Sequence, residues 1–131
     1  MAFWKFFDYI TEDNRSPILD WYGTLDMPVR ATFDVLVQEL TGTEDWDAAK
    51  PTKRKYRLLK RQHLGLCELI FKVDAKKFRP LGVWYREKGE FVFLGGCEHR
   101  RFFSIPANAF DDAFRFKGLL EQGRGATREH V

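Results

Sequence analysis

The sequence predicts an α+β fold, because the spacing of its apolar residues changes twice along the chain. An alternating N-terminal segment is followed by two stretches with the period of a helix. From residue 56 onwards, short alternating segments separated by turn residues predict strands, and a last helical stretch follows residue 104. This order predicts an N-terminal strand, a helical hairpin, a small antiparallel sheet and a C-terminal helix, with the helices covering one face of the sheet.

The acidic first third accounts for the first strand and the hairpin. Residues 2–10 alternate and are rich in aromatic side chains, which is typical of a strand. Ser16-Pro17 predicts a helix start, with serine as N-cap and proline at the first helical position. Residues 26–28 repeat these signals, and Gly42 marks the end of the second helix. The apolar residues of this helix share one face: Val29, Phe33, Leu36, Val37 and Leu40.

The remaining two thirds predict the sheet and the last helix. Gly95-Gly96, inside an apolar strand, predicts a bulge or the close approach of another element. Ser104-Ile105-Pro106 predicts the start of the C-terminal helix. Residues 1–122 are therefore expected to form a single domain, and residues 123–131 a flexible C-terminal tail. The expected strands are residues 56–60, 65–73, 78–86 and 91–99, with hairpin-like connections at 74–77 and 87–90.

Charge is distributed unevenly along the chain. Residues 1–47 contain three basic and ten acidic residues, whereas residues 48–131 contain 19 basic and nine acidic residues. Seven of the cations lie within residues 50–61. This pattern predicts a surface that binds a polyanion such as RNA, and a solvated cationic surface without a ligand has the same pattern. The expected RNA-binding residues are Lys53, Arg54, Lys55, Arg57, Lys60, Arg61 and Arg100.

Several classes of protein do not fit the sequence. The N-terminal residues alternate and carry charge, unlike a secretory signal, and no apolar run approaches the roughly 20 residues of a membrane helix. We therefore expect a cytoplasmic protein with no membrane partner, whose two cysteines stay reduced. If both segments are strands, His63 with Cys67, and Cys97 with His99, each place two possible ligands on one strand face, and zinc accepts such a set of ligands. Because these spacings match no familiar zinc module, we expect no metal and no cofactor.

The end of the last predicted strand carries titratable groups that suit RNA chemistry. Alternation places Glu98 and Arg100 on one face of the strand, and His99 and Arg101 on the other. Histidine exchanges protons near neutral pH, and a carboxylate can act as a base. Two other interpretations stay open: Glu98 forms an ion pair with a neighbouring arginine, and His99 is a surface histidine.

RNA cleavage by a 2′-hydroxyl that attacks the adjacent phosphate needs a base, an acid and cations that stabilise the developing charge. Arg79 is expected on an otherwise apolar strand face. There it either forms a salt bridge at the end of the strand or serves as a functional cation. The candidate catalytic residues are therefore Arg79, Glu98, His99 and Arg101.

Four segments carry a resemblance to a known family. They are Asp13 to Trp21, Gly65 to Lys72, Phe78 to Leu81, and Gly95 to Arg101 continued by Ile105-Pro106 and Ala109 to Ala113. In order, they resemble the motifs dG-x-sPv-x-eW, glwELR-x-k, yRvly and lhgf-x-KK…tP…ei…A. These motifs are typical of the phage-derived, HigB-like branch of the RelE/ParE toxin superfamily.

The resemblance covers residues 3–122 and implies a RelE-like domain. It implies an endoribonuclease that enters the ribosomal A site, cuts mRNA there, and is the toxin of a toxin–antitoxin pair. The implied partner is a helix-turn-helix antitoxin that covers the basic face. By position, Arg79 matches the family's strand arginine, and residues 98–101 occupy the region of its basic KK segment.

The chain also departs from the family pattern at three places. Ile70 stands where the family often has arginine, Pro80 follows Arg79, and Glu98-His99 replaces part of a lysine-rich stretch. These differences keep a second function open, namely a non-catalytic binding module of the same fold. Such a module would be a gyrase inhibitor, a phage-encoded protein that binds a host complex, or a domain that binds nucleic acid or antitoxin without toxicity.

Overall fold

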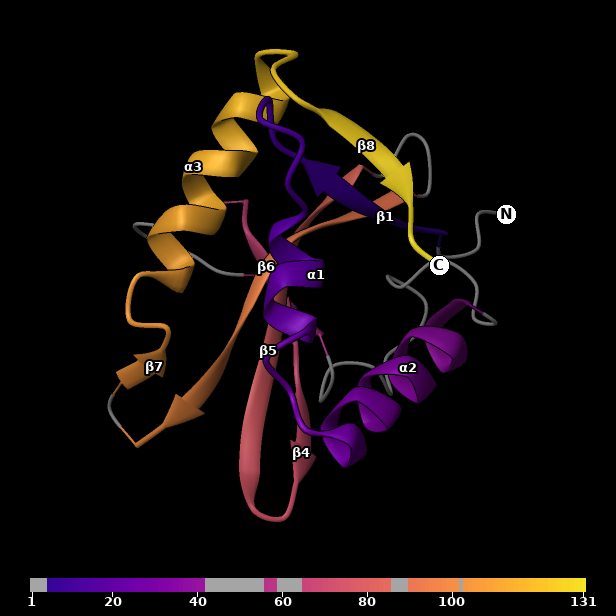
Figure 1. The fold of residues 1–131 in the computed structure, drawn as a ribbon, viewed down its shortest axis with the longest axis vertical. Coiled ribbons are helices and arrows are strands. Elements are labelled where there is room, and N and C mark those ends of the chain that lie inside the picture. The colour runs from indigo at the N-terminus through magenta and orange to yellow at the C-terminus, as the bar shows by residue number, and fades with distance from the viewer. Residues whose placement is uncertain (1–4, 42–55, 59–64, 86–89, 102) are drawn as a thin grey trace.

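The computed structural model describes residues 5–41, 56–58, 65–85, 90–101 and 103–131, and within them three helices and eight strands form an α+β structure (Figure 1). The predicted α+β class is confirmed. The helices are α1 (Pro17–Tyr22), α2 (Met27–Thr41) and α3 (Ala109–Glu121). The strands are β1 (Lys5–Ile10), β2 (Tyr56–Leu58), β3 (Cys67–Leu69), β4 (Phe71–Val73), β5 (Lys76–Tyr85), β6 (Glu90–Arg100), β7 (Phe103–Ile105) and β8 (Ala126–Glu129).

The described strands all belong to one sheet, which is larger than predicted. Its order is β2-β3-β5-β6-β1-β8, with β4 added beside β5 and β7 beside β6. All the described strand pairs are antiparallel except β1 with β6, which is parallel. The sheet is therefore mixed, since the N-terminal strand β1 is parallel to β6 on one side and antiparallel to the C-terminal strand β8 on the other.

Helices cover both faces of the sheet, so the prediction that they cover one face is wrong. Helices α1 and α2 pack with Phe91 and Phe93 of β6, whereas α3 packs with Val92 and Leu94 on the other face. The physical reason lies in β6, where four consecutive apolar residues put large side chains on both faces of the strand. Each face then needs a helix to exclude water from it.

The predicted helical hairpin is confirmed. The Ser16 side-chain oxygen accepts a hydrogen bond from the backbone N–H of Leu19 at 3.4 Å, and Pro17 opens α1. Helix α2 buries the predicted stripe, with Val29, Phe33, Leu36 and Leu40 in the core and Val37 packed against it. The capping residues and the apolar spacing thus determine this part of the fold locally.

The predicted bulge in the last long strand is also present. Leu81 pairs with Gly95 and Gly82 pairs with Phe93, so Leu94 is an extra residue in β6. Gly96 lies against α1, where a Cβ atom would come within 2.4 Å of the Trp21 ring. Both features that the two glycines predicted therefore occur in β6.

The C-terminal part differs from the prediction in two ways. Residues 103–105 form β7, which pairs with β6, and the last helix begins at Ala109 rather than at residues 104–106. The predicted flexible tail contains β8, which pairs antiparallel with β1. Residues 126–129 belong to the sheet because they pair with the second edge of β1, and Asp8 on β1 contacts the following residue His130.

None of the helices in the described part of the chain is long and apolar enough to cross a membrane.

Candidate active site

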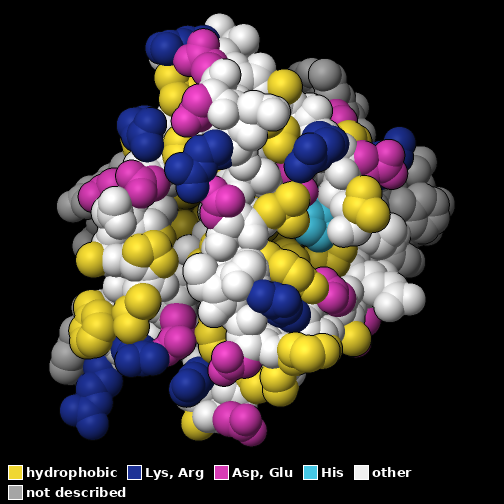
Figure 2. All heavy atoms as spheres, viewed as in Figure 1, with side chains coloured by type: hydrophobic (Ala, Val, Ile, Leu, Met, Phe, Trp, Pro, Cys, Tyr) yellow, Lys and Arg dark blue, Asp and Glu magenta, His cyan; other side chains and the backbone are white. Residues whose placement is uncertain are grey.

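A hollow of about 420 Å³ is lined by residues at the tips of the β4–β5 and β6–β7 hairpins. It brings together four of the residues that the sequence singled out, Glu98, His99, Arg100 and Arg101. Ala75, Lys76 and Phe103 complete its lining. Figure 2 shows Lys and Arg side chains beside hydrophobic ones at this end of the molecule, at the lower left. The hollow is therefore mainly cationic and partly aromatic.

Glu98 is ion-paired at the rim of this hollow. The Arg100 Nε–H group donates to Glu98 Oε2, which agrees with the predicted placement of both residues on one strand face. The Glu98 side chain is 15% exposed and Arg100 is exposed. One of the two interpretations of Glu98, an ion pair with a neighbouring arginine, is thus present, and part of the carboxylate charge is neutralised there.

Arg79 lies behind the hollow rather than in it. Its Nη1 atom is 3.4 Å from Glu68 Oε2, and the two side chains are 12% and 0% exposed. Strand β5 is regular at Pro80, because the extra residue of the bulge lies in β6. Arg79 and Leu81 therefore lie on the same face of β5. Since its guanidinium is mostly buried, Arg79 acts on the hollow through its charge and not as an exposed phosphate ligand.

His99 faces this buried pair. In the strand register it lies opposite Lys77 of β5 and Ser104 of β7, and its side chain is half-buried. Partial burial lowers the pKa of His99 below its ordinary value, and the charges of Arg79 and Lys77 lower it further. Glu68 and a backbone hydrogen bond with Arg101 oppose these effects only in part. The imidazole is therefore neutral near pH 7 and able to accept a proton.

Two exposed residues, Arg101 in the β6–β7 turn and Phe103 at the start of β7, complete the hollow. Arg101 has a φ of 47°, a left-handed conformation that turns the chain from β6 into β7, and its side chain is exposed. Phe103 is 56% exposed, which is unusual for so large an apolar residue. An exposed aromatic ring beside guanidinium groups is the combination on which an unpaired RNA base stacks.

Most of the expected RNA-binding cations lie outside the described residues. These are Lys53, Arg54, Lys55, Lys60 and Arg61. The backbone of Arg57 belongs to β2, where it is paired in register with Glu68 of β3. Of the RNA-binding residues that the sequence predicts, Arg100 is the one whose side chain is placed in the hollow.

Sequence reasoning missed four residues near the site: Glu68, Lys76, Lys77 and Phe103. Lys76 and Lys77 directly follow the turn at Asp74-Ala75, so their position at a hairpin tip was readable from the turn signal. Glu68 carried no such signal, because its contact with Arg79 depends on the pairing of β3 with β5.

The two cysteines do not converge on a common site. Cys67 packs in the core under α1 and α2, whereas Cys97 packs on the opposite face of the sheet under α3. Strand β5 also separates their strands. The described residues contain no group of three or more His, Cys, Asp or Glu side chains suited to a metal ion, and His63 lies outside them.

Comparison with protein-family models, with curated proteins and with solved structures finds no match to this chain.

Proposed function

We propose that the protein is a ribosome-dependent mRNA endoribonuclease, the toxin component of a type II toxin–antitoxin pair. The observation that carries the proposal is the hollow at the hairpin tips, where a neutral imidazole lies beside exposed guanidinium groups and an exposed aromatic ring. The resemblance of residues 3–122 to HigB-like toxins supports the same assignment and a RelE-like arrangement of the domain. The proposed partners are mRNA, the ribosome and a helix-turn-helix antitoxin that covers the basic face.

In the proposed reaction, His99 accepts the proton of a ribose 2′-hydroxyl. The 2′-oxygen attacks the adjacent phosphorus, the bond from phosphorus to the 5′-oxygen breaks, and a 2′,3′-cyclic phosphate forms. The 5′-oxygen leaves and takes up a proton from water. Arg100 and Arg101 stabilise the negative charge on the phosphoryl oxygens. Partial burial, together with the charge of Arg79, lowers the pKa of His99 and so keeps it neutral and able to act as a base.

Binding of the substrate relies on stacking and charge. Phe103 provides a ring against which one base of the mRNA stacks, and the neighbouring arginines contact the phosphates on either side. Glu98 is held by Arg100 and is therefore a positioning group for that arginine rather than the general base.

The test is a titration of the purified protein into a reconstituted translation reaction, with mapping of the 5′ ends of the mRNA. We expect cuts that require ribosomes. Replacement His99→Asn should slow cleavage by about 10²-fold or more, the usual contribution of a general base. The matched control is Arg115→Gln, which removes an exposed cation from α3, far from the hairpin tips.

Full-length mRNA at every protein concentration would rule out this function. Cleavage that is equally fast with His99→Asn would leave the activity in place but remove His99 from it. Circular dichroism and thermal melting of each variant separate a lost reaction from a lost fold.

One observation favours a second candidate, the non-catalytic binding module. Two of the four candidate catalytic residues, Arg79 and Glu98, are held in ion pairs within the chain. A surface organised in this way suits a host protein such as gyrase as well as RNA. Intact transcripts together with inhibition of DNA supercoiling would favour this module.

A further inference from the structure

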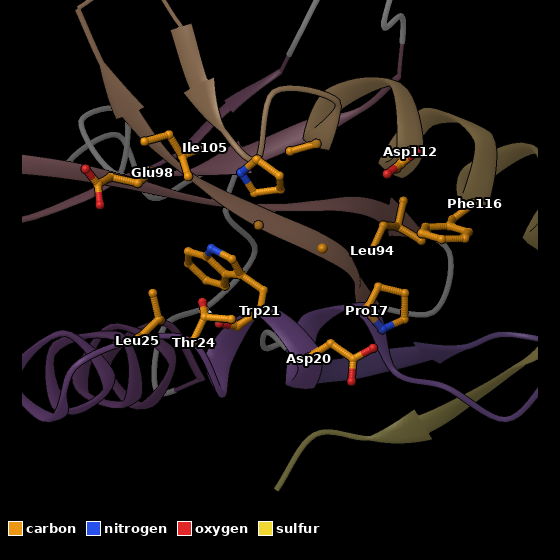
Figure 3. Close-up of a pocket in the computed structure, with 14 residues that line it drawn as sticks. Pro17, Asp20, Trp21, Thr24, Leu25, Leu94, Glu98, Ile105, Asp112 and Phe116 are labelled. Atoms are coloured by element: carbon orange, nitrogen blue, oxygen red, sulfur yellow. Dashed lines mark hydrogen bonds between the residues drawn. The ribbon is translucent and has the colours of Figure 1, made fainter.

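A second concave site lies on the opposite edge of β6 from β5, between α1 and α3. This cleft has a volume of about 580 Å³, within the usual range of ligand sites. Its floor is apolar and contains Trp21, Leu94 and Phe116, with Ile105 at the rim (Figure 3). The proposed function makes no use of these residues.

The cleft exists because the sheet opens at this edge. Strand β1 pairs with β6 as far as Phe93, and β7 pairs with β6 only from Glu98 onwards. Between them, β6 contains the two glycines. Gly96 provides the flat surface on which Trp21 lies, and no atom is found within 4 Å of where a Cβ of Gly95 would be. The two glycines, which have no side chains, thus leave open space along this part of β6.

The charged residues that line the cleft are all acidic. Asp20 of α1 and Asp112 of α3 lie on opposite walls, and Glu98 lies at one end (Figure 3). Their basic partners, Arg15, Arg115 and Arg100, are not part of the lining. Two of these pairs, Arg15–Asp20 and Arg115–Asp112, are more than 40% exposed on both sides. Such pairs contribute little free energy, so an incoming cation can compete for the carboxylates.

Apolar surface continues beyond the cleft along β7. Ile105 is 40% exposed at the rim of the cleft, and Phe103, two residues away on the same strand, is 56% exposed. An occupant that covers this surface as well as the cleft must be longer than a small molecule. Its chemistry must also match an apolar floor between acidic walls.

We propose that the cleft binds a basic, amphipathic peptide segment of a partner protein. A large apolar side chain of the segment packs on Trp21 and Ile105. A lysine or arginine beside it lies between the carboxylates of Asp20 and Asp112. This site borders the hollow at the hairpin tips, because Glu98 lines both and the apolar surface along β7 ends at Phe103 of the hollow. Binding of the peptide requires neither RNA nor a ribosome.

The test uses a fluorescein-labelled synthetic peptide of leucines and lysines and a second peptide with glutamate in place of every lysine. Fluorescence anisotropy is measured with the full chain in the absence of RNA. We expect the lysine peptide to bind and the glutamate peptide not to bind. Each of Asp20→Asn and Asp112→Asn should weaken binding about fivefold, and Ile105→Ala should weaken it as well.

Asp111→Asn is the matched control, since it removes a neighbouring carboxylate in the same first turn of α3 that does not line the cleft. The proposal is overturned if Asp111→Asn weakens binding as much as Asp112→Asn, or if both peptides bind equally. It is also overturned if the lysine peptide does not bind up to about millimolar concentration, or if arginine amide alone binds as tightly as the peptide. Loss of RNA cleavage in other variants has no bearing on these outcomes.

Discussion

The protonation of His99 depends on cations that the strand register places next to it. Lys77 lies directly across from His99 on β5, and Arg79 is two residues further along the same strand face. Both lower the pKa of His99, after the larger effect of burial. The pKa of the proposed general base therefore depends, besides burial, on two residues of the neighbouring strand.

Replacement of Lys77 tests this electrostatic effect on the pKa of His99 directly. In Lys77→Met the pKa of His99 should rise toward the ordinary value of about 6.5, because a nearby positive charge is removed. The measurement is an NMR titration of the His99 ring proton, which requires no activity. Lys5→Met, which removes a cation from β1 near the other end of the sheet, should leave the titration unchanged. A His99 titration that is identical in Lys77→Met and the native protein would contradict the electrostatic argument.

The same shift makes folding depend on pH. Because the pKa of His99 is lower in the folded than in the unfolded chain, the unfolded chain binds the proton first as the pH falls. The stability that His99 contributes is thus fully present at a pH above its pKa in the unfolded chain. It is lost as the pH falls toward and through its lower pKa in the folded chain.

Cys97 is expected to be unreactive in the folded protein. Burial raises the pKa of its thiol to about 11, although the hydrogen bond with Ser104 and the charge of Arg79 oppose the rise. The thiol is therefore protonated at pH 8, and the thiolate is the form that attacks alkylating reagents. Iodoacetamide at pH 8, followed by mass spectrometry, should label Cys97 slowly in the native protein and rapidly in urea. Labelling at equal rates in both would show that the residue is accessible or ionised.

At the scale of elements, the contact between α1 and β6 depends on one glycine. A methyl group on Gly96 would come within 2.4 Å of the Trp21 ring, so Gly96→Ala must displace the helix or the indole. We expect a loss of about 1–3 kcal/mol in the free energy of unfolding and a change in Trp fluorescence. Gly118→Ala is the control, because the new methyl group on α3 meets nothing within 4 Å and should stabilise the helix. Equal stability of Gly96→Ala and the native protein would contradict the close packing.

Strand β8 is held by a side-chain contact as well as by its backbone. His130 Nδ1 is 2.6 Å from Asp8 Oδ1, and both side chains are less than 10% exposed. The imidazole also lies edge-on to Phe33 and Phe93 at 5.9 and 5.2 Å between ring centres. His130→Ala should therefore destabilise the fold by about 1–3 kcal/mol, because it leaves a buried carboxyl group without this partner. Urea unfolding measures the loss, with the exposed Thr127→Ala as control.

Among these elements, those that depend on local sequence signals were predictable, and those that depend on distant strand partners were not. The helical hairpin was predictable because its signals, Ser16-Pro17 and the apolar stripe of α2, act within a few residues of each other. Strand β8 and the parallel pairing of β1 with β6 were not, because each depends on a partner strand far away in the chain. The four consecutive apolar residues at 91–94 did contain the information that both faces of β6 are buried.

In the candidate site, too, contacts between neighbours in the sequence were predictable, and contacts between distant strands were not. His99, Arg100 and Arg101 are neighbours in sequence, so their common position at a strand end was predictable. The burial of Arg79 was not, because it depends on Glu68 from a strand that pairs with β5 on its other side.

For the whole molecule, the uneven charge of the sequence becomes an uneven charge in space. The described acidic residues of the first third include Asp20, Asp34 and Glu39 on α1 and α2, whereas the hairpin tips carry Lys76, Arg100 and Arg101. A polyanion should therefore approach the tips and not the face covered by α1 and α2. This expectation holds whether or not the protein cleaves RNA.

The salt dependence of RNA binding tests this arrangement. Each contact between a cation and a phosphate of single-stranded RNA releases bound counterions, so it contributes a slope of about −0.7 to the plot of log K against log salt. We expect a steep negative slope for a short single-stranded RNA, measured by anisotropy, and a slope shallower by about 0.7 in Arg101→Gln. Arg128→Gln, an exposed cation on β8, should leave the slope unchanged. If both variants reduce the slope equally, the whole molecule attracts RNA through its net charge, and the tips hold no defined phosphate contact.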